Sequence, residues 1–259
     1  MKIGVIGIGT VGKPLYETLK YYHGAENVYA YDIKKEQHPW YKLLETEMLF
    51  ICVPTDSGKD GKLSMNKVDG TLQRLQDDGY RGLVVIKSTL RIGYINETIN
   101  YFNFEIAVFP EWLYAKRALP DTLKPEMTVI GTKNKSKSTA GRILNVCNWH
   151  NKEDMLLVEP EEAVLIKLVA NALASTKISF ANQVMLICRE FNIDFNVVMN
   201  AIKMDPRCAS RYLTPGRPFE GYCLPKDTQE LASCEEDILF KAVIKVNKIM
   251  LNEKRKSEE

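Results

Sequence analysis

The sequence GIGTVG near the N-terminus constrains the fold more than any other feature of this chain. It overlaps the end of a short apolar run, KIGVIG, and an amphipathic segment extends from it to about Tyr22. Gly7, Gly9 and Gly12 allow a tight turn and a close approach of the backbone to a pyrophosphate group, which the start of the next helix can bind. The pattern therefore predicts a strand, a glycine-rich turn and a helix that together form part of a dinucleotide site.

An acidic residue stands where such a site requires one. Asp32 ends a second apolar run, VYAYD, and follows the glycines by about 20 residues, where a carboxylate accepts hydrogen bonds from the adenosine ribose. A carboxylate would repel a 2′-phosphate, so Asp32 favours NAD over NADP. We therefore expect NAD as the cofactor. The residues of the turn expected to bind it are Gly7, Ile8, Gly9, Thr10, Val11 and Gly12.

Strand-like and helix-like segments then alternate along the first half of the chain. The further apolar runs are MLFICVP (48–54), LVVIKST (83–89), FEIAVFP (104–110) and MTVIG (127–131), and a helix is expected around 65–78. This alternation predicts an α/β fold with a parallel, doubly wound, Rossmann-like sheet. Ligands bind at the carboxyl ends of such strands. The residues expected there are Pro54, Thr55, Ser88, Thr89, Pro110 and Glu111.

From Glu159 onward the sequence predicts helices. About thirty residues from Pro160 contain no glycine and no internal proline, which indicates one long helix that proline and acidic residues begin. Lys167 and Asn171 lie four residues apart and so share a face of that helix. A second helix is expected after Asp194, a suitable N-cap. We expect an NAD-binding domain over residues 1–157 and an all-α domain over residues 158–259.

Composition narrows the classes of protein. The formal net charge is only +2, which gives no general attraction to nucleic acid or to an anionic membrane. No targeting signal is visible, and we expect no run of the roughly 18 apolar residues that span a bilayer. The six cysteines form no CxxC pair and the three histidines are scattered, so we expect neither a metal site nor a disulfide framework. A reducing cytoplasm is the expected location.

Cys223 differs from the other five cysteines, most of which we expect to be inert core residues. It stands at the start of the predicted helix LPKDTQELA, where Pro225 suits an early helical position. A helix N-terminus and the nearby cation of Lys226 both lower a thiol pKa and favour the thiolate. The local sequence leaves open whether Cys223 is a nucleophile or a small packed side chain.

Taken together, these residues resemble the nucleotide-sugar (UDP-glucose/GDP-mannose) dehydrogenase family. The matching elements occur in family order and extend over nearly all of residues 1–235. They are GIGTVG, FICVPT, VIKSTL, FPEWL, IKLVANALASTKISFANQ and GYCLPKDTQEL. The CLPKD element is not shared with Rossmann enzymes in general, which makes the resemblance specific.

The resemblance implies a reaction. Family members oxidise the C6 alcohol of a nucleotide sugar to a carboxylate with two NAD, and UDP-glucose is the default substrate. It implies that Cys223 captures the intermediate aldehyde as a thiohemiacetal, which becomes a thioester that water hydrolyses. Lys167 would stabilise an oxyanion. Asn171 would hold that oxyanion or a water, and Asp227 would act with Lys167. Glu111 would activate or position water.

The resemblance also implies binding roles. Thr89 matches a threonine that binds cofactor and water, and Lys226 matches a cofactor contact. Arg207 and Tyr212 match positions that contact the sugar nucleotide, the arginine often across a dimer interface. Gly221 belongs to the substrate loop. Glu111, Lys167 and Asn171 are expected at the sugar as well.

Three departures from the family pattern stand out. The family has a third, Rossmann-like domain that this sequence lacks; another polypeptide supplies it, the sequence is part of a longer chain, or this version works without it. The glycine-rich loop before the cysteine contains Pro218 and Glu220 here, and Glu220 near a pyrophosphate would be unfavourable. Ala115 replaces a second glutamate of many relatives, so thioester hydrolysis is expected to be slower or to use another group.

Two other readings remain open. One is a two-electron dehydrogenase of the hydroxyacid type, which needs no thiol at Cys223. The other is a degenerate, non-catalytic relative that binds NAD. We expect a homodimer. The family resemblance implies an interface through the helical domain, and the long helix carries enough apolar positions to form one.

Overall fold

The computed structural model describes residues 1–34, 37–208 and 211–258. The chain forms two compact units. The first contains Met1–Asp56 and Ser64–Lys167, and the second contains Ser57–Leu63 and the chain from Leu168 onward. The N-terminal half is thus mostly one compact unit, while the short segment Ser57–Leu63 belongs with the C-terminal helices.

The first unit is built on a sheet whose strand order is β2-β1-β3-β4-β5-β6-β7. The strands are β1 (Ile3–Ile6), β2 (Val28–Tyr31), β3 (Met48–Ile51), β4 (Leu83–Ile86), β5 (Ile106–Val108), β6 (Thr128–Thr132) and β7 (Met155–Val158). Neighbouring strands are parallel except β5 and β6, which pair antiparallel. The predicted α/β fold is confirmed, but the expectation of a wholly parallel sheet is wrong at this pair. Mixed sheets are common, and an apolar run does not encode the direction of its strand.

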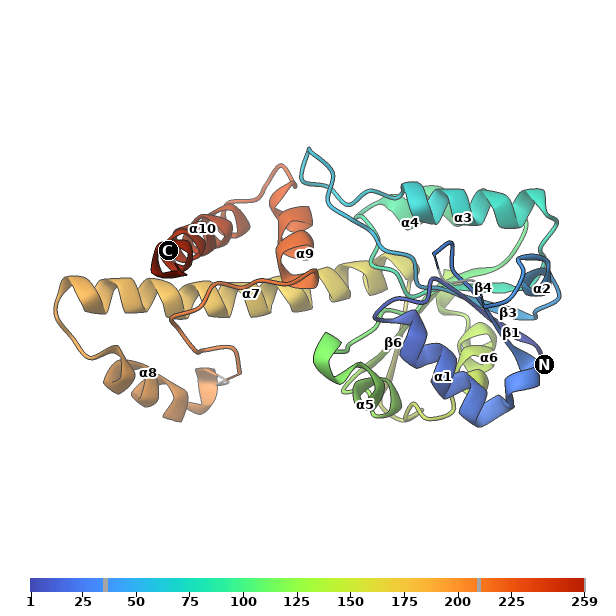
Figure 1. The fold of residues 1–259 in the computed structure, drawn as a ribbon, viewed down its shortest axis with the longest axis horizontal. Helices are drawn as coiled ribbons and strands as arrows, with labels where there is room; N and C mark the ends of the chain where they lie inside the picture. The colour runs from blue at the N-terminus through green and yellow to red at the C-terminus, as the bar shows by residue number, and fades with distance from the viewer. Residues whose placement is uncertain (35–36, 209–210, 259) are drawn as a thin grey trace. The chain divides into compact units, whose positions relative to one another are not determined.

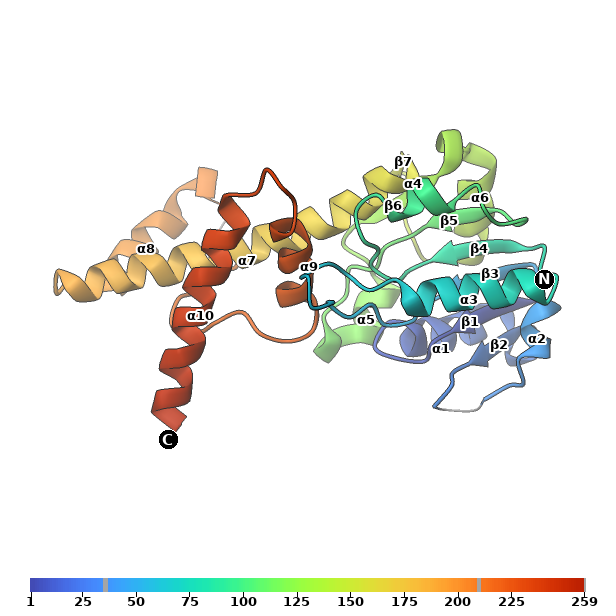
Figure 2. The same ribbon diagram turned by 90° about the horizontal axis from the view of Figure 1, so that it is seen from above.

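Helices cover both faces of this sheet. They are α1 (Gly12–His23), α2 (Tyr41–Leu44), α3 (Asn66–Asp77), α4 (Tyr94–Thr98), α5 (Ala118–Leu123) and α6 (Lys137–Val146), with short 3₁₀ turns at Ala25–Asn27, Ala115–Arg117 and Lys133–Lys135. Helices α1 and α6 lie on one face, and α3 and α4 lie on the other (Figures 1 and 2). This is the doubly wound arrangement that the alternation of segments predicts.

The core of the first unit lies where the central strands are sandwiched between helices. Every residue of β1, β3 and β4 is buried. Val5, Phe50 and Val85 form one cluster with Leu15 of α1 and Ile143 of α6. Strands buried on both faces explain why these segments read as continuous apolar runs rather than as alternating patterns.

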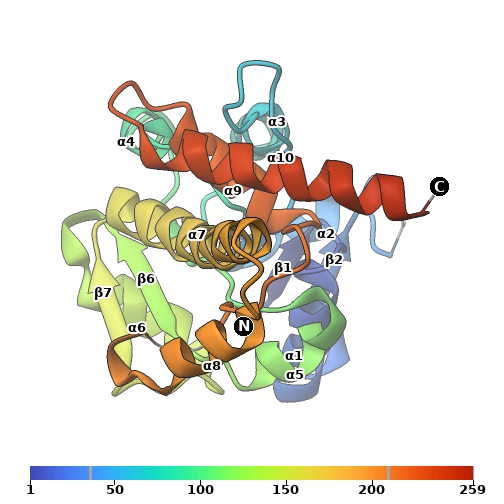
Figure 3. The same ribbon diagram turned by 90° about the vertical axis from the view of Figure 1, so that its left-hand side faces the viewer.

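The second unit is helical. It contains the greater part of α7 (Pro160–Glu190), then α8 (Phe195–Met204), a 3₁₀ turn at Pro206–Cys208, α9 (Cys223–Ala232) and α10 (Leu239–Glu258). Helices α8 and α10 lie on opposite sides of α7 (Figures 1 and 3). The Asp194 side chain accepts a hydrogen bond from the Asn196 amide and caps α8, as the sequence predicts.

Helix α7 differs from one expectation. It contains an 18-residue window of mean hydropathy 1.4, so by length and composition alone it could cross a membrane. Of that window, 39% is buried inside the protein, and core helices pass the same test. The expectation that no segment reaches this level is therefore wrong. Alanine, serine and asparagine stand between the large apolar residues of α7. The sequence therefore shows no continuous apolar run, although the mean hydropathy of the window is high.

Candidate active site

The glycine-rich turn has the geometry of a pyrophosphate site. Gly7 has a positive φ of 90°, and a Cβ there would lie 2.8 Å from the Cys52 carbonyl oxygen. A Cβ on Gly12 would lie 1.8 Å from the Gly7 carbonyl oxygen, so α1 can pack this closely only with glycine. Nothing lies within 4 Å of a Cβ on Gly9. The backbone at Gly9 therefore faces open space, which fits a ligand that approaches the turn there.

Asp32 lies directly beside this turn. Its carboxylate accepts hydrogen bonds from the Ile8 amide at 2.7 Å and from the Lys34 amide at 2.8 Å. A carboxylate has about four lone-pair sites, so capacity remains for the hydroxyl groups of a ribose. The residues present thus fit an adenine dinucleotide, with Gly9 open to the phosphates and Asp32 available to the sugar.

The residues that follow β3 and β4 lie at the same edge of the sheet, because these strands are adjacent and parallel. The Ser88 hydroxyl donates to the Val53 carbonyl at 2.7 Å and so joins the two strand ends. Thr55 is buried, whereas Pro54 is exposed and Thr89 is half-buried. The predicted strand-end residues of β3 and β4 are therefore brought together.

Glu111, after β5, is engaged by a residue that the sequence analysis missed. Lys87 directly follows β4, and its Nζ lies 3.2 Å from Glu111 Oε2, with side chains 1% and 6% exposed. Lys87 also donates to the Phe109 carbonyl at 3.3 Å and lies over the Phe109 ring. A buried pair of this kind fixes both side chains, because neither charge can be solvated by water if the ion pair breaks. The signal was available, because a lysine interrupts the apolar run LVVIKST.

Lys167 lies beside the same glutamate. Its Nζ donates to the Glu111 carbonyl oxygen at 2.6 Å and lies 4.7 Å from the centre of the Trp112 ring. The Trp112 indole nitrogen is buried and has no hydrogen-bond partner among the described residues. Lys87, Glu111, Trp112 and Lys167 thus form one cluster in the first unit, which we call the glutamate cluster. It contains the partly exposed Lys167 cation and the buried Trp112 indole nitrogen.

A second cluster lies in the helical unit, on α7 and α9. Asp227 is fully buried and accepts hydrogen bonds from Asn171 Nδ2 at 2.5 Å and from Lys226 Nζ at 2.6 Å. The next residue, Thr228, donates to Ser175 Oγ, one turn after Asn171 on α7. The carboxylate is therefore held by an amide and an ammonium group. Lys226, predicted to contact the cofactor, is itself buried against Asp227 and the Tyr222 ring.

Cys223 is the first residue of α9 and is exposed. Asp227 follows it by one helical turn, so the two share a face of α9. Of the other cysteines, Cys52, Cys147 and Cys188 are buried as expected. Burial raises the pKa of Cys52 and of Cys147 to about 12.

The remaining two thiols lie outside the core. Cys208 is half-buried and Cys234 is exposed. Partial burial and, next, the carboxylates of Glu230 and Asp237 raise the pKa of Cys234. Cys223 is therefore the exposed thiol at a helix N-terminus, where the helix dipole favours negative charge.

The segment before Cys223 contains Glu220, one of the departures from the family pattern noted in the sequence. Gly221 has a positive φ of 84°, which a side chain would strain. The Glu220 carboxylate lies against Lys254 Nζ on α10 at 2.8 and 3.0 Å. This ion pair borders a pocket of about 550 Å³ that Arg189 and Arg217 also line. The charge of Glu220 is thus partly offset.

The two residues predicted to contact the sugar nucleotide have unusual settings. Tyr212 has a positive φ of 70°, which is rare for a bulky side chain and is typical of functional positions. The Arg207 guanidinium is exposed and donates to both oxygens of Asp205, at 2.9 and 3.0 Å through Nε. This contact lowers the pKa of the Asp205 carboxyl.

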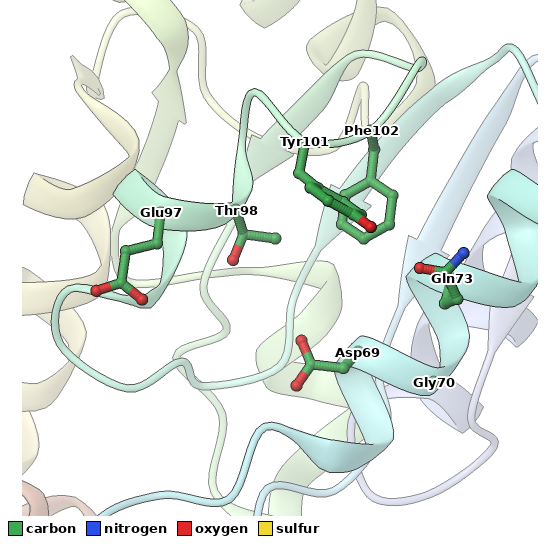
Figure 4. Close-up of a pocket in the computed structure, with 7 residues that line it drawn as sticks. All are labelled: Asp69, Gly70, Gln73, Glu97, Thr98, Tyr101 and Phe102. Carbon is green, nitrogen blue, oxygen red and sulfur yellow. The ribbon is translucent and has the colours of Figure 1, made fainter.

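A separate pocket in the first unit carries none of the predicted residues. It has a volume of about 470 Å³ and lies between α3 and the segment from α4 to Phe102 (Figure 4). Asp69 on one wall accepts a hydrogen bond from the Tyr94 hydroxyl at 2.6 Å. Tyr101 and Phe102 form the opposite wall. Nothing in this pocket resembles a reaction centre.

The doubly wound sheet and the glycine turn with Asp32 place the first unit in the class of dinucleotide-binding folds. Comparison with known proteins makes this specific. The sequence model described as "UDP-glucose/GDP-mannose dehydrogenase family, NAD binding domain" matches residues 32–147, and that for the family's central domain matches residues 161–249. The chain belongs to the UDP-glucose/GDP-mannose dehydrogenase family. The predicted cofactor, NAD, is confirmed by this match.

Individual relatives agree. The chain is 31% identical to UDP-glucose 6-dehydrogenase of Rickettsia bellii over 218 residues, which are 80% of this chain and 50% of that protein. It is 30% identical to UDP-glucose 6-dehydrogenase of Campylobacter jejuni over 77% of this chain and 53% of that protein. A solved UDP-glucose dehydrogenase from Pyrobaculum islandicum superposes with a TM-score of 0.81 at 26% identity, covering 96% of this chain and 68% of that one. The chain thus spans about half the length of these two curated relatives.

Proposed function

We propose that this protein catalyses the NAD-dependent, four-electron oxidation of the C6 alcohol of a nucleotide sugar, with UDP-glucose as the default substrate. The observation that carries the proposal is the arrangement on α9. An exposed Cys223 begins the helix, and a fully buried Asp227, bound by Asn171 and Lys226, follows one turn later. Dehydrogenases of the two-electron type have no need of a thiol, whereas covalent capture of an aldehyde requires one.

The oxidation proceeds through two hydride transfers and one hydrolysis. When bound, NAD accepts one hydride in each of two oxidations. After the first, the Cys223 sulfur adds to the aldehyde carbon, and the carbonyl oxygen takes up a proton to give a thiohemiacetal. Loss of a hydride and a proton converts this adduct into a thioester. Water then attacks the thioester carbon, the carbon–sulfur bond breaks, and the sugar acid leaves with the thiol restored. Two NAD and one water are consumed for each alcohol.

The charged side chains supply the electrostatics of these steps. We assign Lys167 to the oxygen on C6, which becomes negatively charged as each tetrahedral carbon forms. We assign Asn171 to the same oxygen or to a water. The Asp227 carboxylate fixes Asn171, and we assign it to act with Lys167 in positioning or proton transfer. We assign Glu111 to positioning the hydrolytic water. The buried Lys87 keeps the Glu111 carboxylate in place, which supports this role because a mobile carboxylate could not aim a water molecule.

Binding residues complete the proposal. The glycine turn and Asp32 bind NAD. The strand-end residues, which include Thr89, contact NAD along the edge of the sheet. Arg207 and Tyr212 contact the sugar nucleotide, and Gly221 allows the backbone to approach it. Because the Arg207 side chain is exposed and its ion pair with Asp205 lies at the surface, exchange of Asp205 for a phosphate is a small rearrangement.

We propose a homodimer formed through the helical unit. One side of α7 exposes Leu165, Val169, Leu173 and Phe180, at helical spacing of four and seven residues. Such a stripe is costly to leave in water and is typical of an interface. We expect the protein to act in the cytoplasm, where nucleotide sugars and NAD are both present, without a nucleic-acid or membrane partner.

The decisive assay mixes the purified chain with NAD and UDP-glucose, follows NADH absorbance and quantifies UDP-glucuronate. We expect two NADH for each acid formed, and no acid from Cys223→Ser. One NADH per product, or unchanged turnover in Cys223→Ser, would show a two-electron dehydrogenase instead. The chain spans about half the length of its curated relatives, so its substrate can differ from theirs. UDP-N-acetyl sugars and GDP-mannose are therefore tested next. No turnover with any of them, while NAD still binds, would favour a non-catalytic relative or a missing partner chain.

A further inference from the structure

The segment between residues 213 and 222, which leads into Cys223, forms neither helix nor strand. It contains two glycines with positive φ, Gly216 at 91° and Gly221 at 84°, and two prolines that have no amide hydrogen. A segment of this kind cannot hold its own shape through backbone hydrogen bonds. Its conformation must be imposed by neighbouring side chains.

Asn182 on α7 imposes part of it. The side chain is completely buried, and its Oδ1 accepts a hydrogen bond from the Gly216 amide at 2.8 Å. Its Nδ2 donates to the Arg217 carbonyl at 2.8 Å. One amide side chain therefore satisfies a donor and an acceptor of two consecutive backbone units, as a neighbouring strand would.

Asn247 on α10 does the same two residues later. It is 6% exposed; its Oδ1 accepts from the Phe219 amide at 2.7 Å, and its Nδ2 donates to the Phe219 carbonyl at 3.0 Å. The Phe219 side chain is itself buried. Residues 216–219 are thus held from two different helices, and four bonds are made by two side chains that carry no charge and have no titration of their own.

We propose that Asn182 and Asn247 are positioning residues, which hold the backbone of residues 216–219 and thereby fix Gly221 and Cys223 for the reaction. The inference rests on the proposed function and extends it. Buried asparagines that merely fill space would not direct both ends of each amide to one short segment. Nor would two helices converge on the stretch that ends four residues before the nucleophile.

The test compares Asn182→Ala and Asn247→Ala with Asn200→Ala, whose side chain is exposed on α8. Hydrogen exchange of the full-length proteins reports the Gly216 and Phe219 amides directly. We expect these amides to exchange roughly tenfold faster or more in the two variants than in the unmodified protein. The amides of α7 should keep the exchange rates of the unmodified protein. Unchanged exchange at both amides would overturn the anchoring. Asn200→Ala is expected to match the unmodified protein.

A second readout separates positioning from stability. At a temperature well below each melting midpoint, we expect kcat with NAD and the nucleotide sugar to fall roughly tenfold, with little change in KM for NAD. Asn247→Asp keeps the acceptor for the Phe219 amide and loses the donor, so it should recover part of kcat. Full kcat in both alanine variants would leave the asparagines as structural residues only and would overturn the proposal. Variants that fail to fold are replaced by their aspartate counterparts, judged by the same two outcomes.

Failure of the proposed function gives a different pattern. If the unmodified chain oxidises no nucleotide sugar, the second readout is the rate at which iodoacetamide labels Cys223. A labelling rate altered severalfold in the alanine variants, but not in Asn200→Ala, would support positioning of the thiol even so. An equal rate in all four proteins would overturn it.

Discussion

Single buried polar residues decide most of what this protein can do. Lys87, Asp227 and Asn182 are almost fully buried. Lys87 and Asp227 are bonded to residues that the proposed reaction uses, whereas Asn182 is bonded to the backbone of the segment that leads into Cys223. None could be assigned from sequence by periodicity, since a lysine after a strand or an asparagine in a helix is usually solvated. Lys87 interrupts an apolar run, and that interruption was the available signal. Its pairing with Glu111 depends on the adjacency of β4 and β5, which only the folded sheet supplies.

Replacing Lys87 by methionine is predicted to destabilise the first unit. The substitution leaves the Glu111 carboxylate buried without its partner, which typically costs about 3–5 kcal/mol. The double variant Lys87→Met/Glu111→Gln removes both charges and should regain much of that loss. Urea unfolding of the unmodified protein, Lys87→Met, Glu111→Gln and the double variant measures each free energy of unfolding. If the double variant loses as much stability as the two single variants added together, the pair is not coupled.

His150 provides a pH-dependent prediction. Burial, and secondarily the charge of Lys87, lowers its pKa from 6.5 to about 3. The unfolded chain therefore binds more protons than the folded one between these values, so stability is present above pH 6.5 and is lost as pH falls toward 3. The largest slope from this residue is about 1.4 kcal/mol per pH unit. His150→Gln, which cannot titrate, should show a shallower decline in urea unfolding between pH 7 and 4.5. Parallel profiles would contradict this cause.

At the scale of elements, long periodic segments could be predicted from sequence and short ones could not. The apolar runs correspond to β1 through β6, and the glycine-free stretch corresponds to α7. Helices of four to six residues, such as α2 and α5, have too few residues to show a period. The antiparallel direction of β6 was also not predictable, because it depends on how the chain returns to the sheet edge.

The glycine turn offers a matched pair of substitutions. A methyl group at Gly12 would meet the Gly7 carbonyl oxygen, so Gly12→Ala should destabilise the start of α1 by about 1–3 kcal/mol. A methyl group at Gly9 meets no protein atom, so Gly9→Ala should fold normally yet bind NAD roughly tenfold or more weakly. Thermal melting and NAD titration by calorimetry separate the two effects. Unimpaired NAD binding by Gly9→Ala would contradict the assigned phosphate position.

At the scale of the whole molecule, the chain combines an NAD-binding unit with a helical unit, and both match one family. The boundary expected between residues 157 and 158 stays a prediction. The segment Ser57–Leu63 was not predictable as part of the helical unit, since its attachment depends on contacts between residues far apart in the sequence, of which one is a hydrogen bond. That contact runs from the Leu63 amide to the buried Glu230 carboxylate at 2.6 Å.

The proposed dimer gives a prediction at this scale. Leu173→Lys/Phe180→Lys places two charges in the exposed apolar stripe of α7 and should convert a dimer into a monomer at micromolar concentration. Light scattering coupled to gel filtration measures the mass. Tyr101→Lys, at an exposed aromatic residue of the first unit, serves as the control and should leave the mass unchanged. A monomeric unmodified protein would contradict the proposed assembly.

The central claim is that the Cys223 sulfur becomes bonded to the substrate carbon. Its most direct test is mass spectrometry of the protein, quenched in acid within seconds of mixing Glu111→Gln with NAD and UDP-glucose. Slowed hydrolysis should let the thioester accumulate, so we predict that the peptide containing Cys223 gains the mass of the sugar nucleotide less the four hydrogens removed by the two oxidations. A product formed at full stoichiometry with no adduct on that peptide, or an adduct on another cysteine, would contradict the account.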